Sequence, residues 1–264
     1  MSLALLIVLA TSPAAAPLSG ASSVLYAQAI KDGKFTSTYR ALKTDVSPTS
    51  DNKSFYVVWK AVERPTRWMV MVHGTGGFAT DQLAVWSAHL KDREIGVVSI
   101  QWWFGRNGPG DYYAPTDLYR EIEASLAAQN VLPAHAMLFG FSRGSANSYA
   151  VKAIDAGRGK NYFALCVASS GGVALNFPPT AAIAKGAYGS EPLRGTKWVL
   201  SAGAKDPNPD RDGIKGMRDT AKWLESQGAI VVKAIEDPKF GHGALALNAG
   251  DARQVLDLFF QLTP

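Results

Sequence analysis

The sequence predicts an α/β fold with a mostly parallel sheet and helices on both faces. Short apolar runs rich in Val, Ile and aromatic residues alternate with stretches of helical spacing along nearly the whole chain, as in successive βαβ units. Several of these runs are apolar throughout, which is typical of strands covered on both faces. The chain has 264 residues, 47% apolar and 19% charged, and this composition fits one globular domain with a sizeable core.

The N-terminus has the pattern of an export signal. Residues 3–10, LALLIVLA, form an apolar core too short to span a bilayer as a helix, and small residues follow. We expect a signal peptide over residues 1–21, cut after Ala21 rather than after Ala16, which would leave Pro17 first. No Lys or Arg precedes Lys31, so the positive n-region is missing, and a buried N-terminal strand or helix is the alternative. The expected mature protein, residues 22–264, is a single domain, secreted or periplasmic, with no membrane-spanning segment.

The elements before residue 80 follow from local patterns. The run 35–39, FTSTY, predicts a short strand, and residues 47–54 form a turn cluster. Residues 54–60, SFYVVWK, are rich in β-branched and aromatic side chains, which favours a strand. Residues 68–72, WMVMV, predict a second, fully buried strand that leads directly into the Gly-rich loop 73–77, HGTGG.

The next segment predicts helix, strand, loop and helix. Residues 80–93 have apolar side chains at helical spacing, as do residues 116–130. Between them, residues 95–103 predict a third buried strand. Loops at the carboxyl ends of parallel strands surround the ligand site in open α/β sheets, so aromatic residues near the Gly- and Pro-rich loop 105–115 are candidates for a substrate pocket. They are Trp102, Trp103, Tyr112 and Tyr113. Packing at the base of the loop is an equal alternative for these residues.

The most informative motif lies between residues 136 and 156. An apolar run, 136–139, precedes Gly140-Phe141-Ser142-Arg143-Gly144, and a helix-compatible run, 145–156, follows. This is G-x-S-x-G between a strand and a helix, where a tight turn exposes a serine hydroxyl in a strained backbone conformation. Gly140 and Gly144 lack the Cβ that would clash with the neighbouring chain. The amide of Arg143 would face a developing oxyanion from a helix N-terminus. A chance match in a Gly-rich protein is the alternative.

The last third of the chain continues the alternation. Strands are expected at 163–169, 197–203 and 230–235, with a helix over 210–227 and a closing helix over 244–262. The segment 171–196 is rich in Gly, Pro and Ala and long for a plain connection, as lids and substrate walls often are. The single cysteine, Cys166, excludes an intrachain disulfide and a Cys-rich metal site, and its apolar surroundings favour a buried role.

Residues with useful chemistry follow several of the expected strands. Ser142 follows one strand, and Asp206 lies just past the end of another, where a carboxylate can reach a histidine of the next loop. Asp210 and Asp212 are alternatives, although they fit the start of the helix that follows.

The histidine can be chosen by elimination. His89 lies within a helix, and His135 precedes the strand of the G-x-S-x-G motif, at the far end of the sheet from Ser142. His73 lies in the Gly-rich loop, where we expect it to hold the loop. Only His242 follows the last strand, and a glycine on each side frees its loop to reach Ser142.

The loop 73–77 lets backbone amides face a ligand. A phosphate-binding loop and a plain tight turn are the alternatives; the Walker A motif is excluded because no Gly-Lys-Ser/Thr follows, and G-x-G-x-x-G does not match. In serine hydrolases of this layout the loop after such a strand supplies an oxyanion donor. The amide of Thr75 is therefore the candidate partner of the Arg143 amide.

With these residues the chain resembles the α/β-hydrolase superfamily over residues 55–262. The matching parts are the loop that starts at His73, the G-x-S-x-G motif, Asp206 and His242, in the order Ser, Asp, His. More narrowly, it is similar to secreted esterases related to polyhydroxybutyrate depolymerases and feruloyl esterases. The resemblance implies a catalytic domain in which Ser142 is the nucleophile, His242 the base and then the acid, and Asp206 the orienting acid. It also implies an oxyanion hole made by the amides of Thr75 and Arg143.

The expected function is that of a serine esterase, which cleaves a small-molecule or polymeric ester through an acyl-enzyme intermediate and needs no cofactor. The short segment 171–196 leaves little room for a large cap, which favours small or extended, accessible acyl groups. A serine peptidase or amidase on the same fold and a catalytically silent envelope binding protein are the alternatives.

Two other classes of protein are disfavoured. The four histidines are scattered, with no H-x-x-x-H or H-E-x-x-H pair, so no metal site is expected. The net charge of +5, from 27 basic and 22 acidic residues, comes without a Lys/Arg cluster, so no nucleic-acid partner is expected.

Overall fold

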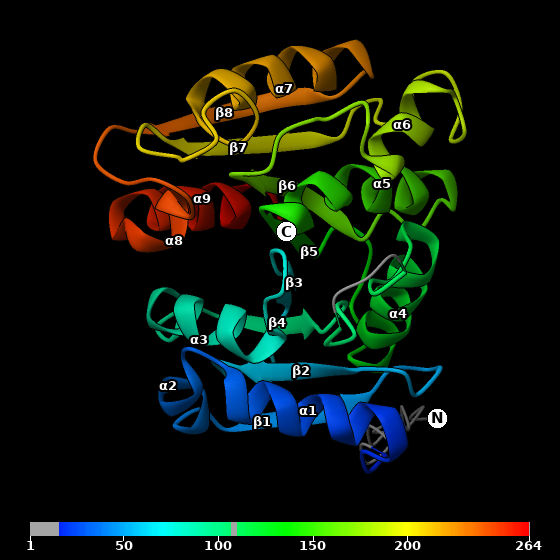
Figure 1. Cartoon of the computed structure of the whole chain (residues 1–264), viewed down its shortest axis with the longest axis vertical. Helices are drawn as coiled ribbons and strands as arrows, with labels where there is room; N and C mark the ends of the chain where they lie inside the picture. Colours follow the sequence, from blue (N-terminus) through cyan, green and yellow to red (C-terminus); the bar gives the residue numbers. More distant parts are fainter. Residues whose placement is uncertain (1–15, 107–109, 264) are drawn as a thin grey trace, which may run out of the picture.

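In the computed structural model, which describes residues 16–106 and 110–263, the strands form one sheet in the order β1-β2-β4-β3-β5-β6-β7-β8 (Figure 1). The antiparallel pairings join β1 (Thr44–Pro48) to β2 (Phe55–Lys60) and β2 to β4 (Ile95–Ile100). The other pairings are parallel and involve β3 (Arg67–Val72), β5 (Ala136–Phe141), β6 (Phe163–Ser169), β7 (Lys197–Gly203) and β8 (Ile230–Asp237). The predicted mostly parallel sheet is confirmed.

Helices cover both faces of this sheet. On one face lie α1 (Gly20–Asp32), α3 (Ala79–Leu90) and α9 (Ala249–Leu262), and on the other α4 (Pro115–Ala128), α5 (Arg143–Gly157) and α7 (Ile214–Ser226). Along β3, Met69 and Met71 pack in the first core layer, whereas Val70 and Val72 pack in the second. Successive side chains of a strand point to opposite faces, so a strand covered on both faces must be apolar throughout.

The N-terminal region differs from the prediction. The strand expected over residues 35–39 is wrong, because this segment forms the short helix α2 (Thr36–Arg40). The carboxylate of Asp81 on α3 accepts hydrogen bonds from the backbone N–H groups of Lys34 (2.9 Å) and Phe35 (2.8 Å). These two N–H groups lie just before α2, where the helix itself offers no acceptor for them. Helix α1 and strand β1 were not predicted.

The expected signal peptide lies largely outside the described residues, including its apolar core, 3–10. The expected cut after Ala21 falls within α1. In this helix Ser22 donates from Oγ to Oδ1 of Asn52 (2.7 Å), and Leu25 is buried in the core. The helix is thus an integral part of the layer that covers β2.

The C-terminal helix is divided in two. A short α8 (Ala244–Leu247) ends at Asn248, whose side chain then accepts hydrogen bonds from the N–H groups of Gly250 and Asp251 and caps α9. An Asn cap of this kind begins a new helix. The connection between β6 and β7 contains one further short helix, α6 (Pro178–Ala184), which packs against α5.

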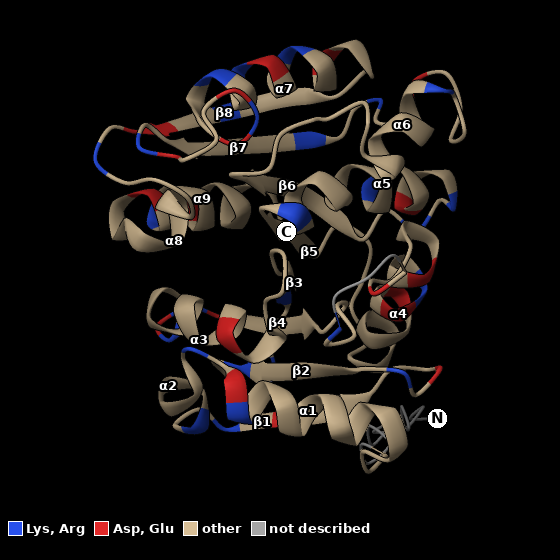
Figure 2. Cartoon of the chain, viewed as in Figure 1, with Lys and Arg blue, Asp and Glu red and all other residues tan. Residues whose placement is uncertain are grey.

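Charges of both signs are mixed along α4 and α7 (Figure 2). Among the described residues no helix is both long enough and apolar enough to span a bilayer.

Candidate active site

The turn between β5 and α5 has the strained geometry that the motif requires. Ser142 has φ 53° and ψ −120°, in the region that non-glycine residues avoid. A Cβ on Gly140 would lie 2.6 Å from the Cα of Ser145, and one on Gly144 would lie 2.2 Å from the carbonyl oxygen of Val72. Both glycines are therefore required by close backbone contacts. Gly171, which sequence reasoning did not single out, is equally constrained, because its Cβ would lie 2.0 Å from the carbonyl oxygen of Ser142.

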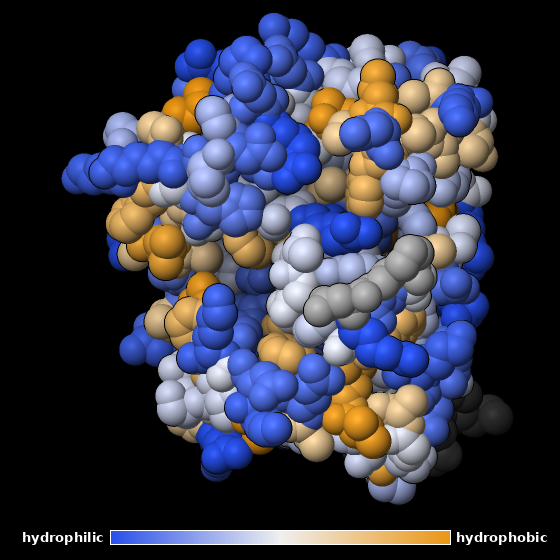
Figure 3. Space-filling view, viewed as in Figure 1, coloured by the Kyte–Doolittle hydropathy of each residue, from blue (hydrophilic) through white to orange (hydrophobic). Residues whose placement is uncertain are grey.

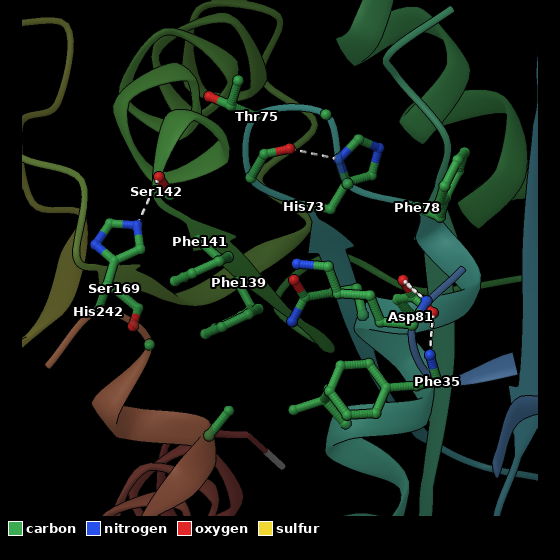
Figure 4. Close-up of a pocket in the computed structure, with 18 of the residues that line it drawn as sticks. Phe35, His73, Thr75, Phe78, Asp81, Phe139, Phe141, Ser142, Ser169 and His242 are labelled. Carbon is green, nitrogen blue, oxygen red and sulfur yellow. Dashed lines mark hydrogen bonds between the residues drawn. The ribbon is translucent and has the colours of Figure 1, made fainter. Parts of the chain in front are cut away.

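Ser142, His242 and Asp206 form a continuous chain of hydrogen bonds. The Oγ of Ser142 lies 2.9 Å from Nε2 of His242, and Nδ1 of His242 lies 2.8 Å from Oδ2 of Asp206 (Figure 4 shows the first contact). A carboxylate can only accept, so the Nδ1–H of the imidazole donates to Asp206. In the neutral ring, Nε2 is then the acceptor, and the hydroxyl of Ser142 donates to it. These three side chains, 36 and 100 residues apart in sequence, meet at one edge of the sheet.

The structure distinguishes Asp206 from the two alternative acids. Asp206 is buried, and its Oδ1 accepts from the backbone N–H of Asn208 at 2.9 Å. Asp212 is buried too, but its carboxylate is held by the guanidinium of Arg211 at 2.7 and 2.9 Å. Asp210 is exposed and pairs with Lys215. Only Asp206 of these three carboxylates is hydrogen-bonded to the His242 ring.

Asp206, Asp212 and His242 also place one ligand atom each within 4.8 Å of one another. Carboxylate and imidazole are suitable donors for a metal ion. Both ring nitrogens of His242 are engaged, however, by Asp206 and Ser142, and Asp212 is neutralised by Arg211. The donor set therefore fits proton transfer better than metal binding.

Glycines bring the loop of His242 close to the loop of Asp206. A Cβ on Gly241 would lie 2.6 Å from the carbonyl oxygen of Lys205, and one on Gly203 would lie 2.4 Å from that of Gly241. Gly243 has φ 86°, a conformation that glycine adopts without strain. The ring of Phe141 lies 5.0 Å from the imidazole of His242 and packs against it. The glycines beside His242 thus allow the close approach, as expected from the sequence.

The Gly-rich loop after β3 lies next to Ser142. A Cβ on Gly74 would lie 3.1 Å from the Cβ of Ser142. Within residues 16–106 and 110–263, no hydrogen-bond acceptor is found for the backbone N–H of Thr75 or of Arg143. The N–H of Gly76, by contrast, donates to the hydroxyl of Tyr112 at 2.9 Å. Two amides therefore stay available near the Ser142 hydroxyl, and a tyrosine holds the loop that carries one of them.

His73 holds this loop, as the sequence predicted. It is buried, its Nδ1 lies 2.9 Å from the carbonyl oxygen of Gly74, and its Nε2 accepts from the backbone N–H of Trp102 at 3.4 Å. Burial lowers the pKa of His73 to about 4, because the charged imidazolium is poorly solvated there. The ring is therefore neutral at pH 7. His89 and His135 bond instead to the carbonyl oxygens of Ala246 and Pro133.

Two of the four aromatic candidates have a different role from the one expected. Trp102 is only 1% exposed and donates from Nε1 to the carbonyl oxygen of His73, while Tyr113 is buried and donates from its hydroxyl to Asp51. The pocket prediction is wrong for these two residues. Trp103 and Tyr112 form an isolated β-bridge, which folds the loop back on its own base. For Trp102 and Tyr113, packing at the base of the loop is what the structure contains, whereas a substrate contact by Trp103 or Tyr112 stays a prediction.

The cavity beside Ser142 and His242 lies elsewhere, on the side of α3. It has a volume of about 480 Å³. Its wall comes from the α1–α2 turn, the loop after β3, α3, the end of β5 and α8 (Figure 4). The visible face of the molecule is hollowed between α8 and α3 (Figure 3). Much of the lining is apolar, including Phe35, Phe78, Val85, Phe141 and Leu247. Sequence reasoning missed these residues, since nothing in their local pattern sets them apart from core side chains.

Comparisons with known proteins agree with this architecture. No protein-family model and no curated protein matches the sequence. Among solved structures, an esterase from Pyrobaculum calidifontis matches with a TM-score of 0.64 at 14% identity, covering 91% of each chain. The Bacillus cereus carboxylesterase matches at 0.53 and 17%, over 78% of this chain and 93% of its own. A brefeldin A esterase, described as a bacterial homologue of human hormone sensitive lipase, matches at 0.60 and 17%, over 95% and 88%. At these identities the likeness establishes the α/β-hydrolase fold, which confirms the predicted fold.

Proposed function

We propose that this chain hydrolyses carboxylic esters through an acyl-enzyme intermediate on Ser142. The observation that supports this most directly is the hydrogen-bond chain from Asp206 through His242 to Ser142, with Ser142 strained and facing a cavity. Several solved structures of similar fold are esterases, and this likeness supports ester hydrolysis as the chemistry. Strain of this kind persists only when the surrounding structure enforces it, and it is concentrated at functional sites.

In the first half-reaction the Oγ of Ser142 attacks the ester carbonyl carbon. An Oγ–C bond forms, the hydroxyl proton moves to Nε2 of His242, and the π electrons of the carbonyl move to its oxygen. The amides of Thr75 and Arg143 donate to that oxyanion. When the tetrahedral intermediate collapses, the C–O bond to the alcohol breaks and His242 returns its proton to the leaving oxygen. The acyl group stays on Ser142.

In the second half-reaction water takes the place of the alcohol. His242 accepts a proton from water, whose oxygen bonds to the acyl carbon, and then protonates the Oγ of Ser142 as the acid departs. Asp206 keeps the Nδ1–H of His242 in place through both steps and stabilises the imidazolium that forms. No redox change occurs and no co-reactant except water is needed.

The finer specificity expected from the sequence stays a prediction. A likeness to polyhydroxybutyrate depolymerases and feruloyl esterases predicts turnover of poly(3-hydroxybutyrate) or of methyl ferulate. Release of 3-hydroxybutyrate or ferulate by the purified protein would support that subtype, and turnover of simple esters alone would remove it.

Export also stays a proposal, with a revised cut. Ser19 accepts from the side chain of Asn52 at 3.1 Å, and Ser22 donates to the same residue. A cut after Ala21 would remove Ser19, whereas a cut after Ala16 would leave α1 intact. We therefore propose a secreted or periplasmic protein that begins at Pro17. N-terminal sequencing of the protein recovered from outside the cytoplasm tests this, and an unprocessed N-terminus there would contradict it.

The test of the function is hydrolysis of p-nitrophenyl acetate, butyrate and octanoate, with p-nitroanilides of the same acids alongside. We expect turnover of the esters, slow or no turnover of the anilides, and loss of both in Ser142→Ala. Faster cleavage of anilides would favour an amidase or peptidase. If a correctly folded wild type cleaves neither series and no fluorophosphonate labels it, a silent binding protein becomes the better account.

A further inference from the structure

The cavity beside Ser142 contains a polar side chain for which the described residues provide no partner. Gln82 lies on α3, is 9% exposed and lines the cavity. Its amide forms no hydrogen bond with another described residue. Gln101, which is also buried, accepts from the N–H of Ala79 and donates to the carbonyl oxygen of Trp103, both at 2.8 Å. The amide of Gln82 thus lies in the wall of the cavity without a partner among the described residues, where its donors and acceptor are open to a ligand.

The surroundings of Gln82 define what kind of group it can meet. Phe78, the N-cap residue of α3, lies about one turn before Gln82, and Val85 lies about one turn after it. Both line the cavity, together with Phe139 and Phe141 of β5. An amide set in an apolar wall fixes the orientation of a ligand through one hydrogen bond, while the apolar surface supplies most of the binding energy. The complementary ligand is apolar along its length and polar at one position.

The position of the cavity relative to His242 indicates which part of an ester enters it. In the proposed reaction the leaving alcohol oxygen must receive a proton from Nε2 of His242. Figure 4 shows His242 at one side of the cavity and Phe78, Asp81 and Phe35 at the opposite side. The alcohol stays beside His242, so the acyl group is the part that extends toward α3.

The wall opposite His242 is held in place. Asp81 fixes the α1–α2 turn through the amides of Lys34 and Phe35, at 2.9 and 2.8 Å. This contact places Phe35, which is 44% exposed, over the cavity. The pocket is therefore largely formed before a ligand enters, and such a pocket discriminates between ligands of similar size.

We propose that Gln82 determines acyl specificity: its amide hydrogen-bonds a hydroxyl or carbonyl group at the far end of an otherwise apolar acyl chain. The inference rests on the proposed esterase function and adds a substrate class to it. The preferred substrates are esters of medium-sized alkyl or aryl acids that carry one hydrogen-bonding group away from the ester. An ester with a plain hydrocarbon acyl group would leave the amide unpaired.

The test compares matched esters in the full-length folded protein. The substrates are p-nitrophenyl esters of phenylacetic, 3-phenylpropanoic and 4-phenylbutanoic acid, each with and without a 4-hydroxyl group, so that the polar group moves outward by one methylene at a time. The readout is the ratio of kcat/KM for the hydroxylated and plain member of each pair. Because both members are measured on one protein, any general change in activity cancels from the ratio.

For the wild type we expect at least one pair to favour the hydroxylated ester by about tenfold, the effect of one hydrogen bond in a buried site. Gln82→Met, which keeps the length of the side chain and removes the amide, should bring that ratio to one or below. Val85→Ala is the matched control, since it enlarges the same cavity and leaves the amide in place, and it should keep the preference.

Three results separate the outcomes. If the wild type cleaves p-nitrophenyl acetate but favours the plain ester in every pair, the proposed role of Gln82 is refuted, while the esterase proposal stands. An unchanged ratio in a folded Gln82→Met variant also refutes the role of Gln82. If that variant fails to fold, the wild-type ratios alone test the role. No cleavage of any ester, acetate included, would instead be a failure of the proposed function.

Discussion

Replacing Asp206 by Asn tests the proposed role of the buried carboxylate. The carboxylate accepts two hydrogen bonds, from the N–H of Asn208 at Oδ1 (2.9 Å) and from Nδ1–H of His242 at Oδ2 (2.8 Å). An Asn side chain has only one acceptor oxygen. If that oxygen stays with the N–H of Asn208, the amide NH₂ faces Nδ1 of His242 and donates to it. The imidazole proton must then lie on Nε2, which can no longer accept the proton of Ser142.

The magnitude follows from the cost of the other arrangement. Turning the amide over would leave the part-buried N–H of Asn208 facing an NH₂ group, at a cost of about 2 kcal/mol, so the inactive tautomer is favoured about 30-fold. Loss of the negative charge that stabilises the imidazolium of His242 adds to this, and in serine proteases the corresponding replacement lowers kcat by about 10⁴. We expect kcat for p-nitrophenyl butyrate to fall by roughly 10³ to 10⁴.

The assay pairs kinetics with a structural readout. Stopped-time hydrolysis gives kcat, and ¹⁵N chemical shifts of His242 report which ring nitrogen carries the proton. Asp212→Asn is the control, because Asp212 is buried nearby but bonded to Arg211 and not to His242. A loss below about tenfold in Asp206→Asn, or a larger loss in Asp212→Asn, would refute the reasoning.

Three more perturbations test the supporting structure. The pKa of His73 is lowered from 6.5 to about 4, so the unfolded state binds the proton first as pH falls. The free energy of unfolding should therefore drop by up to about 3 kcal/mol from pH 6.5 to 4, and urea titrations of His73→Asn should show this part of the pH dependence removed. Gly144→Ala should lower the free energy of unfolding by about 3 kcal/mol, because the new Cβ would meet the Val72 carbonyl oxygen at 2.2 Å. Gly157→Ala is the control: a Cβ there has no neighbouring atom within 4 Å, and the free energy of unfolding should change by less than about 1 kcal/mol. Tyr112→Phe removes the acceptor of the Gly76 N–H and should lower kcat about tenfold with little change in melting temperature; an unchanged kcat would show that the loop needs no such support.

The inner strands, β3 to β7, could be predicted because each is short, mostly apolar and covered on both faces. The G-x-S-x-G turn was equally readable, since Gly140 and Gly144 occupy positions where a Cβ meets backbone atoms. Joining Ser142 to Asp206 and His242 needed only the rule that strands of a parallel sheet end at one edge. The hydrogen bonds among their side chains could not be derived, because they depend on loop conformations.

Elements fixed by distant contacts escaped prediction. Residues 36–40 include β-branched side chains that favour a strand, yet they form a helix. Just before this helix, the N–H groups of Lys34 and Phe35 donate to Asp81, which lies 47 and 46 residues away in sequence. Trp102 and Tyr113 follow a strand, as pocket residues often do, but the loop between them folds back and buries both. Gln82 gave no signal at all, because a glutamine within a helix is ordinary until its surroundings are known.

The most direct test of the central claim is the mass of the protein during turnover. Wild type and Ser142→Ala are mixed with p-nitrophenyl acetate, quenched in acid within the first turnovers, digested and analysed by mass spectrometry. The account predicts an added acetyl group on the wild-type peptide that contains Ser142 and none on the variant. Turnover with no acetyl group on that peptide, or with the acetyl group on another side chain, would contradict it.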